Sequence, residues 1–505
     1  MEWQDGYVTE IEYVHGVYRE LGPSVLNLVL LIQSIEPVPI KEGFTYCDLG
    51  CGQGGSVNLF AACHPEGEFH AVDFNPAHIT GARELSERAG LQNVSFWEAS
   101  FAELDSLPLP DFDFVVMHGI YSWVGPDNRQ HIRDFLLKKV KPGGVVYLSY
   151  NSLPGWSAHA PLRELLSSFA DTQPGSLDQR VDRAIAFADK LKKAGAAIFE
   201  TNPATSEFFD YLCTLPRNYL AHEFFNHDWT LFYHADIVRD LAAARLTYAG
   251  SAHFADNQDM LRFSERQQQL IDGVSDRVMR ETVKDFTAAP LLRRDVFTKG
   301  RPKLAPSLQL EHFCNRRFAL VAPQSTLVRK AHFPIGEVLF DRALYDPILQ
   351  ALELKPQSLQ ELMLRREVAE LGMPRVIEAV MVLLCAEYLM PAVEPGLPEL
   401  MSVRRFNSVL LDRQVNDLDK QSLASPVLQN ACKLEWLERL LILCEINRNP
   451  DPLPWLWKNM KNHGHKLTRD GEVLHSDAEN LAELKLQIES FRALKLPLLR
   501  QLGIL

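Results

Sequence analysis

Two acidic residues and three glycines near the start of the chain have the types and the spacing of a nucleotide-type cofactor site. Gly50, Gly52 and Gly54 alternate with other residues directly after Asp48, and Asp73 ends the next apolar segment. Glycine adopts positive φ angles and leaves no Cβ between the backbone and a ligand. An acid about twenty residues beyond such a turn is placed to accept hydrogen bonds from a ribose. These residues predict a bound cofactor with a ribose.

The spacing of the glycines distinguishes two kinds of cofactor. A dinucleotide fingerprint reads G-x-G-x-x-G and holds a pyrophosphate at a helix N-terminus, whereas this chain reads D-x-G-x-G-x-G. A carboxylate at position 48 would repel a pyrophosphate, but it suits a ligand that carries an ammonium group. The alternative is a glycine turn that serves only the packing of a strand against a helix.

Cysteine and histidine pairs near these segments do not have the spacing of a metal site. Cys47 and Cys51 form C-x-x-x-C without a second pair, so we interpret them as small packed thiols. His222 and His227 are off the two-histidine zinc pattern, and we interpret their segment as a lid or substrate loop. We therefore predict no metal.

The elements that would position the acids alternate between strand and helix. The apolar runs 43–46, 68–73, 93–97, 112–117 and 144–150 are expected strands, separated by helical segments such as 76–89, and 246–251 is an expected sixth strand. Such alternation predicts a parallel sheet with right-handed crossovers and ligands at the carboxyl ends of its strands.

Two aromatic segments follow the fourth and fifth expected strands. They read H-G-I-Y-S-W-V from His118 and Y-N-S-L-P-G-W from Tyr150. Aromatic faces attract cations and an amide oxygen accepts from an amine, so the segments suit a pocket for an alkylammonium or amine. Alternatively, Trp123 and Trp156 only wedge the loops against the sheet.

Together, the D-x-G-x-G-x-G motif and the two aromatic segments resemble bacterial class I S-adenosylmethionine-dependent methyltransferases that carry a methyltransferase regulatory domain. The rickettsial outer-membrane-protein lysine methyltransferases are members of that family. The resemblance covers most of the chain. It implies a Rossmann-like sheet and S-adenosylmethionine as the cofactor, and it only suggests a substrate.

The resemblance also implies roles for single residues. Asp48 would lie near the ammonium group of the cofactor, and Asp73 would accept from the ribose hydroxyls. The family usually has an acid after the third strand for the adenine amino group, so either Ser100 makes this contact or Glu98 is shifted into the role. Phe101 either covers the adenine or is an ordinary core residue. The expected cofactor contacts are Asp48, Gly50, Gly52, Gly54, Asp73, Phe74, Ser100, Phe101 and His118.

Methyl transfer from a sulfonium depends mainly on alignment and desolvation. A lysine acceptor must first lose its proton; an aromatic, dry pocket disfavours its ammonium form, and His118 or Tyr121 would take the proton through water. We expect catalytic roles for His118, Tyr121 and Asn151. The expected substrate contacts are Tyr121, Trp123, Asn151, Pro154 and Trp156.

Length and charge limit the remaining possibilities. A chain of 505 residues is too long for one core. The net charge of -13 argues against nucleic acid and favours a basic partner such as a lysine-bearing polypeptide. Eight scattered cysteines, with no apolar segment long enough to span a bilayer, predict a cytoplasmic protein without membrane insertion.

The pattern along the chain predicts five parts. They are a cofactor-binding core (1–156), a helical insertion (157–215) that the resemblance links to a possible homodimer, completion of the sheet (216–265), a partly winged-helix-like middle domain (266–395) and a mainly helical C-terminal domain (396–505). We expect a methyltransferase for protein lysines. The alternatives are a small-molecule methyltransferase and a non-catalytic regulator that binds the cofactor.

Overall fold

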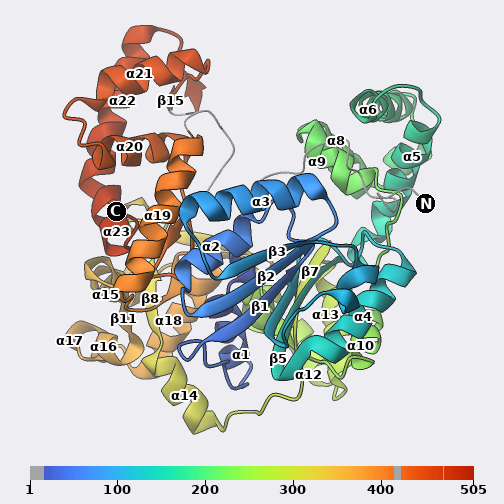
Figure 1. Cartoon of the computed structure of the whole chain (residues 1–505), viewed down its shortest axis with the longest axis horizontal. Helices are drawn as coiled ribbons and strands as arrows, with labels where there is room; N and C mark the ends of the chain where they lie inside the picture. The colour runs from blue at the N-terminus through green and yellow to red at the C-terminus, as the bar shows by residue number, and fades with distance from the viewer. Residues whose placement is uncertain (1–15, 415–421, 470) are drawn as a thin grey trace.

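The computed structural model describes residues 16–414, 422–469 and 471–505, so residues 1–15 of the expected core lie outside the described residues. At its centre is a seven-stranded sheet with the order β3-β2-β1-β4-β5-β7-β6 (Figure 1). Only β7 is antiparallel to its neighbours, β5 and β6. The strands are β1 (Phe44–Leu49), β2 (Gly67–Asp73), β3 (Val94–Glu98), β4 (Phe112–Met117), β5 (Val140–Asn151), β6 (Thr247–Ser251) and β7 (Leu292–Thr298). This arrangement confirms the expected Rossmann-like sheet.

Helices cover both faces of the sheet. Alternate residues of a strand point to opposite faces, and accordingly Tyr46 and Phe114 join one apolar core whereas Cys47 and Val115 join another. The first core includes α1 (Pro23–Ile32), α2 (Gly55–Cys63) and α3 (Pro76–Ala89); the second includes α4 (Pro126–Lys139) and α10 (His234–Ala242). The central strands are buried on both sides, as their nearly continuous apolar sequences require.

A helical insertion follows β5 and forms a lobe beside the sheet (Figure 1). It has its own apolar core, which includes Trp156. Its helices are α5 (Ala160–Asp171), α6 (Leu177–Lys193), α7 (Ala197–Glu200), α8 (Pro203–Cys213) and α9 (Arg217–Phe224).

The sheet does not end near residue 265, where we expected it to end. After α11 (Asp259–Arg262), α12 (Glu265–Asp272) and α13 (Arg277–Ala288), β7 enters the sheet between β5 and β6. The sequence of β7 contains Arg293 and Asp295, which are unusual in a buried strand, yet they are 7% and 0% exposed. The expectation failed because these charges are paired with each other inside the protein.

The middle part surrounds a three-stranded sheet of order β11-β8-β12. The periodicity of the sequence predicts three helices here, over 341–352, 358–370 and 374–387; they are present, but the second is divided into two short helices. The elements are α14 (Pro306–Asn315), β8 (Arg317–Leu320), β9 (Lys330–Phe333), β10 (Gly336–Leu339), α15 (Arg342–Leu354), β11 (Gln357–Ser358), α16 (Leu359–Met363), α17 (Arg366–Ala369), α18 (Met373–Cys385) and β12 (Leu389–Ala392).

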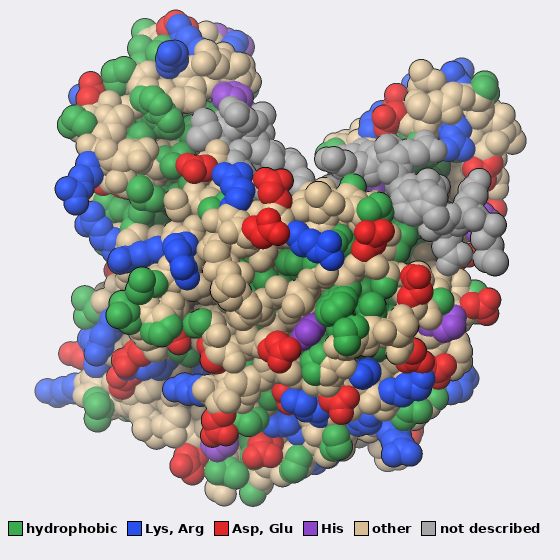
Figure 2. Space-filling view, in the orientation of Figure 1, with side chains coloured by type: hydrophobic (Ala, Val, Ile, Leu, Met, Phe, Trp, Pro, Cys, Tyr) green, Lys and Arg blue, Asp and Glu red, His purple; other side chains and the backbone are tan. Residues whose placement is uncertain are grey.

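The C-terminal part packs against the cofactor-binding half. Helix α19 (Leu397–Gln414) contacts α2 and α3, and the hairpin β13 (Ser422–Ser425) and β14 (Asn430–Lys433) contacts α2. A second lobe (Figure 2) holds α20 (Trp436–Ile446), α21 (Pro452–Asn462), β15 (Thr468–Arg469), β16 (Glu472–Val473) and α22 (Asp477–Ser490), before α23 (Leu496–Gln501) ends the chain. No helix among the described residues is both long and apolar enough to span a bilayer.

Candidate active site

The strand order reverses between β1 and β4, and this point defines a crevice at the carboxyl edge of the sheet. Strand β1 leads to β2 and β3 on one side, whereas β4 leads to β5 on the other. In open α/β sheets ligands bind at such a reversal. The crevice is bordered by the loop after Leu49 and by the loop after Met117.

The glycine loop has the backbone geometry that a close ligand needs. Gly50, Gly52 and Gly54 have φ angles of 74°, 54° and 69°, which other residues rarely adopt. A Cβ on Gly54 would lie 2.7 Å from the Cβ of Ala82, so this glycine allows α2 and α3 to pack. At Gly52 a Cβ would meet no atom of the described residues within 4 Å, apart from its own chain neighbours. Gly52 therefore borders open space, and Gly54 has a packing role.

Asp73 organises the loop through both oxygens of its carboxylate. Oδ2 accepts from the backbone N–H of Gly52 at 2.8 Å, and Oδ1 accepts from that of Asn75 at 2.9 Å. His78 Nδ1 lies 3.3 Å from Oδ1. Asp73 is only 7% exposed, so the lone pairs of its oxygens that accept no hydrogen bond face the glycine loop.

Asp48 is a buried carboxylate without a partner. It is 4% exposed, and no hydrogen bond or ion pair joins its side chain to another residue in the described part of the chain. Burial, with the nearby charge of Asp73, raises the pKa of Asp48 to about 7. A buried charge without a partner is costly. An ammonium group next to Asp48 would remove that cost, so the residues present fit a cofactor with an amino-acid end.

The wall expected for an adenine ring follows β3. The backbone N–H and the hydroxyl of Ser100 both donate to Glu103 Oε2, at 2.8 and 2.7 Å. These bonds leave lone pairs of the Ser100 oxygen available to accept from an amino group. Glu98 lies in register with Asp73 and is exposed, so both alternatives for the adenine contact stay open. Phe74 and Phe101 are half-buried.

His118 forms the opposite border of the crevice, at the end of β4. Its Nδ1 is 2.8 Å from the hydroxyl of Tyr147, and its ring lies 3.9 Å from the ring of Tyr18, measured between centroids. Burial lowers the pKa of His118 to about 4, so the imidazole is neutral near pH 7. A group with so low a pKa is a poor acceptor for a proton from an amine.

Tyr121 does not have the position that we expected. Its side chain is fully buried, and its hydroxyl donates to Asp240 Oδ2 at 3.1 Å. Burial, together with the charge of Asp240, raises the pKa of Tyr121 to about 12. We correct the expected catalytic and substrate roles of Tyr121, because a side chain enclosed in the core beside Phe232 is out of reach of a substrate.

The two tryptophans have positions that favour packing. Trp156 is 6% exposed, its Nε1 donates to the carbonyl of Leu291 at 2.9 Å, and its ring lies 5.2 Å from that of Trp229. It therefore fixes the insertion to the sheet, and its contact with substrate stays a prediction. Trp123 is 8% exposed. The neighbouring Pro154 follows a cis peptide bond.

Asn151 has an unused side-chain amide at the end of β5. The residue is 6% exposed, its Nδ2 is buried, and no partner for its amide is found among the described residues. Its backbone N–H donates to Ser122 Oγ at 2.9 Å, which joins the two aromatic segments to each other. A buried polar group without a partner commonly marks a place where a ligand binds.

Sequence reasoning missed a buried charge network between β5, β7 and their helices. Asp295 accepts from Tyr150 at 2.7 Å and from Arg293 at 3.1 Å, and it lies 3.0 Å from His234 Nδ1. Arg293 also pairs with Asp285, whose pKa is raised to about 6 mainly by burial. Tyr150 and His234 are far from Asp295 in the sequence, so no local pattern could have revealed the whole network.

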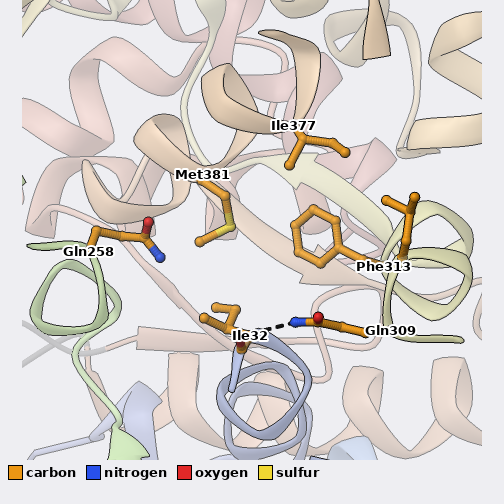
Figure 3. A pocket seen from close by; sticks show the side chains of 7 residues that line it. Ile32, Gln258, Gln309, Phe313, Ile377 and Met381 are labelled. Carbon is orange, nitrogen blue, oxygen red and sulfur yellow. Dashed lines mark hydrogen bonds between the residues drawn. The ribbon is translucent and has the colours of Figure 1, made fainter. Parts of the chain in front are cut away.

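A cavity elsewhere in the molecule is separate from this crevice. One of about 250 Å³ lies between α1, α14 and α18, where Ile32, Phe313 and Met381 approach one another (Figure 3). It contains none of the expected cofactor contacts. No cluster of three or more potential metal ligands occurs among the residues that the structure describes.

The sheet order, with an antiparallel β7, and the glycine loop between two acids define a class I methyltransferase that uses S-adenosylmethionine. A family model described as a methyltransferase domain matches residues 40–193, and one described as a predicted methyltransferase regulatory domain matches residues 216–299. An uncharacterized protein of Synechocystis is 38% identical over 506 residues, which cover 100% of both chains. An uncharacterized protein of Rickettsia prowazekii is 24% identical over 55% of this chain and 50% of that protein.

The fold is also similar to that of a solved structure along nearly its whole length. The structure of PKMT2 from Rickettsia typhi in complex with AdoHcy has a TM-score of 0.67 and 17% identity, covering 95% of this chain and 98% of that one. The chain therefore belongs to the family of methyltransferases that carry a methyltransferase regulatory domain.

Proposed function

We propose that this methyltransferase methylates lysine amines of a protein substrate. The observation that carries the proposal is Asn151 at the carboxyl end of β5, whose buried Nδ2 has no hydrogen-bond partner among the described residues. Nδ2 can donate to a carbonyl of a bound polypeptide, and the oxygen of the same amide can accept from an amine N–H and direct the nitrogen lone pair toward a methyl donor. The resemblance to the rickettsial lysine methyltransferases and the net charge of -13 support a basic polypeptide.

We assign the cofactor to the crevice between β1 and β4, where it would supply an electrophilic methyl group on a sulfonium. Asp48 would pair with its ammonium group, Gly50 and Gly52 would approach its methionine part, and Asp73 would accept from its ribose. The adenine and the sulfonium of the cofactor would be bordered by Phe74, Ser100, Phe101 and His118.

Glu223 on α9 is our candidate for attracting the substrate ammonium group. This half-buried carboxylate has no hydrogen bond or ion pair within the described residues, and burial raises its pKa to about 7. Phe224 on the same helix lies 6.1 Å from Trp156 in the second aromatic segment, measured between ring centroids, so α9 packs beside the loop that follows β5. Glu223 therefore replaces His118 and Tyr121 in our account of proton removal.

The insertion is our candidate for contact with a second copy of the chain. Tyr211 on α8 is 57% exposed, which is high for an aromatic side chain. Sedimentation velocity should give a dimer, and a species of monomer mass at micromolar concentration would exclude it.

All eight cysteines are unpaired, which supports a reducing, cytoplasmic location.

Transfer of a labelled methyl group into a bacterial lysate tests the acceptor. Half of the lysate would first have its lysines acetylated, and the other half would be mock-treated. We expect labelled protein bands in the mock-treated half only, and loss of labelling with Asn151→Ala. Label confined to small metabolites, or equal labelling after acetylation, would contradict a lysine acceptor.

A further inference from the structure

Residues 16–22 cross the cofactor crevice, and we refer to this segment as the strap. The backbone N–H of Tyr18 donates to Ser56 Oγ at 3.0 Å, in the first turn of α2. A Cβ on Gly55 would lie 2.8 Å from the carbonyl oxygen of Gly16. On the other side of the crevice, the ring of Tyr18 lies against His118. The strap thus bridges the two loops that border the crevice.

The strap residues after Tyr18 are held by more than one part of the molecule. Glu20 pairs with Arg294 of β7 at 3.4 Å, and the carbonyl of Leu21 accepts from Tyr46 of β1 at 3.1 Å. These two contacts belong to the methyltransferase sheet. The contacts of Arg19, which lies between Tyr18 and Glu20, come from elsewhere.

Arg19 contacts both the middle and the C-terminal part of the chain. Its guanidinium pairs with Glu387 and donates to Met390 Sδ at 3.2 Å. Its carbonyl accepts from Asn430 Nδ2 of β14 at 2.9 Å. Lys433 of β14 lies 3.4 Å from the same Glu387 carboxylate. The residue next to Tyr18 is therefore the meeting point of three parts of the molecule.

The contact with Asn430 is built into the packing. Asn430 is fully buried. A Cβ on Gly22 would lie 2.6 Å from Asn430 Nδ2, so the strap approaches the hairpin as closely as only glycine allows. A buried hydrogen bond of this kind is costly to break, because the carbonyl of Arg19 would keep only the backbone N–H of Gly22, at 3.2 Å, and Asn430 is the shorter of its two donors.

We propose that the middle and C-terminal parts hold the strap over the cofactor, with Asn430 and Glu387 as positioning residues for Tyr18. Tyr18 would cover the sulfonium end of the crevice, where an aromatic face attracts a cation. The parts of the chain beyond the sheet would thereby set the affinity and the residence time of S-adenosylmethionine. This inference concerns cofactor binding alone and does not depend on a lysine acceptor.

The test compares two buried asparagines, Asn430 in the β13–β14 hairpin and Asn407 on α19 against that hairpin, by calorimetry on the full-length protein. Asn430→Ala removes the side-chain donor to the carbonyl of Arg19, and we expect the dissociation constant of S-adenosylmethionine to rise about 3- to 10-fold. The matched control is Asn407→Ala. Asn407 bonds both backbone groups of Ala424 in β13, at 2.8 and 2.9 Å, and does not contact the strap. We expect Asn407→Ala to lower Tm similarly and to leave the dissociation constant within about twofold of that of the wild type.

Equal dissociation constants for Asn430→Ala and the wild type would overturn the proposal. Equal weakening by both asparagine variants would overturn it too, because the effect would then be general loosening. If Asn430→Ala does not fold, Glu387→Gln decides. Glu387 is half exposed, and we expect its loss to speed cofactor release about 2- to 5-fold at low salt, with less effect at high salt. A release rate without change at low salt would contradict the coupling.

Discussion

In the protein without cofactor, the buried charge of Asp48 lowers the free energy of unfolding, and a role in binding a cation explains why it is there. Its pKa is 3.8 in an unfolded chain and about 7 in the folded one. Between pH 3.8 and about pH 7 the folded state binds more protons than the unfolded state, so the free energy of unfolding falls as the pH rises. Above pH 7 the ionised carboxylate is a full destabilising charge. This strain is relieved when a cation binds.

Asp48→Asn should therefore stabilise the free protein while it removes cofactor affinity. At pH 8 we expect the free energy of unfolding to rise by about 2–4 kcal/mol, and the affinity for S-adenosylmethionine to fall by roughly 10- to 100-fold. Urea unfolding and calorimetry measure the two effects. A variant that is less stable than the wild type at pH 8 would contradict the unpartnered state of Asp48.

The affinity for the cofactor should depend on pH through the same residue. Below pH 7 Asp48 must release a proton before it pairs with an ammonium group, so affinity should rise by up to about tenfold per pH unit toward pH 7. Above pH 8 it should fall, because an α-amino group loses its proton with a pKa of about 8. Calorimetry between pH 5 and 9 should show both limbs in the wild type. In Asp48→Asn the lower limb should be absent.

At the scale of elements, the sequence predicted best where periodicity and glycine spacing decide the structure. Strands β2 to β5 and helix α3 follow from apolar runs and from stops such as Gly90, and the acids Asp48 and Asp73 follow from the motif. Strand β7 could not be predicted, because its charges are unusual in a buried strand and part of their partners, such as Tyr150 and His234, lie far away in the sequence. Tyr121 was misplaced for a related reason: the sequence pattern indicates the loop, but packing decides which side chains face the crevice.

The charge network that supports β7 should be sensitive to the loss of one partner. Asp295→Asn leaves Arg293 buried with an incomplete set of charges, and we expect a loss of about 3–5 kcal/mol in the free energy of unfolding. Asp236→Asn is a control, since Asp236 of α10 forms its ion pair with exposed Arg239, and the amide oxygen of asparagine can still accept from the backbone N–H of Tyr233. A loss below about 1 kcal/mol for Asp295→Asn, as for a surface pair, would show that the network is not structurally important.

At the scale of the whole molecule, the parts beyond the sheet pack tightly against it. Helix α19 and the β13–β14 hairpin share one apolar core with α2, the helix that follows the glycine loop. Removing them would expose the apolar face of α2 to water. The methyltransferase sheet and the C-terminal part should therefore unfold together.

Phe406→Ala tests this coupling from the C-terminal side. Phe406 lies on α19 and is 1% exposed, so its truncation should cost about 3–5 kcal/mol. The urea transition should stay single and move to lower concentration, whether followed by tryptophan fluorescence or by cofactor binding. Two separate transitions, with cofactor binding lost only in the second, would indicate independent domains.

Binding of S-adenosylmethionine to the acid-flanked glycine loop is the central claim, and calorimetry of Asp73→Ala tests it most directly. Asp113→Ala is the matched control, because Asp113 lies near the start of β4 and pairs with Lys141, away from the carboxyl edge. We predict that the wild type and Asp113→Ala bind the cofactor alike and that Asp73→Ala binds it at least about tenfold more weakly. An unchanged affinity in Asp73→Ala would contradict the claim.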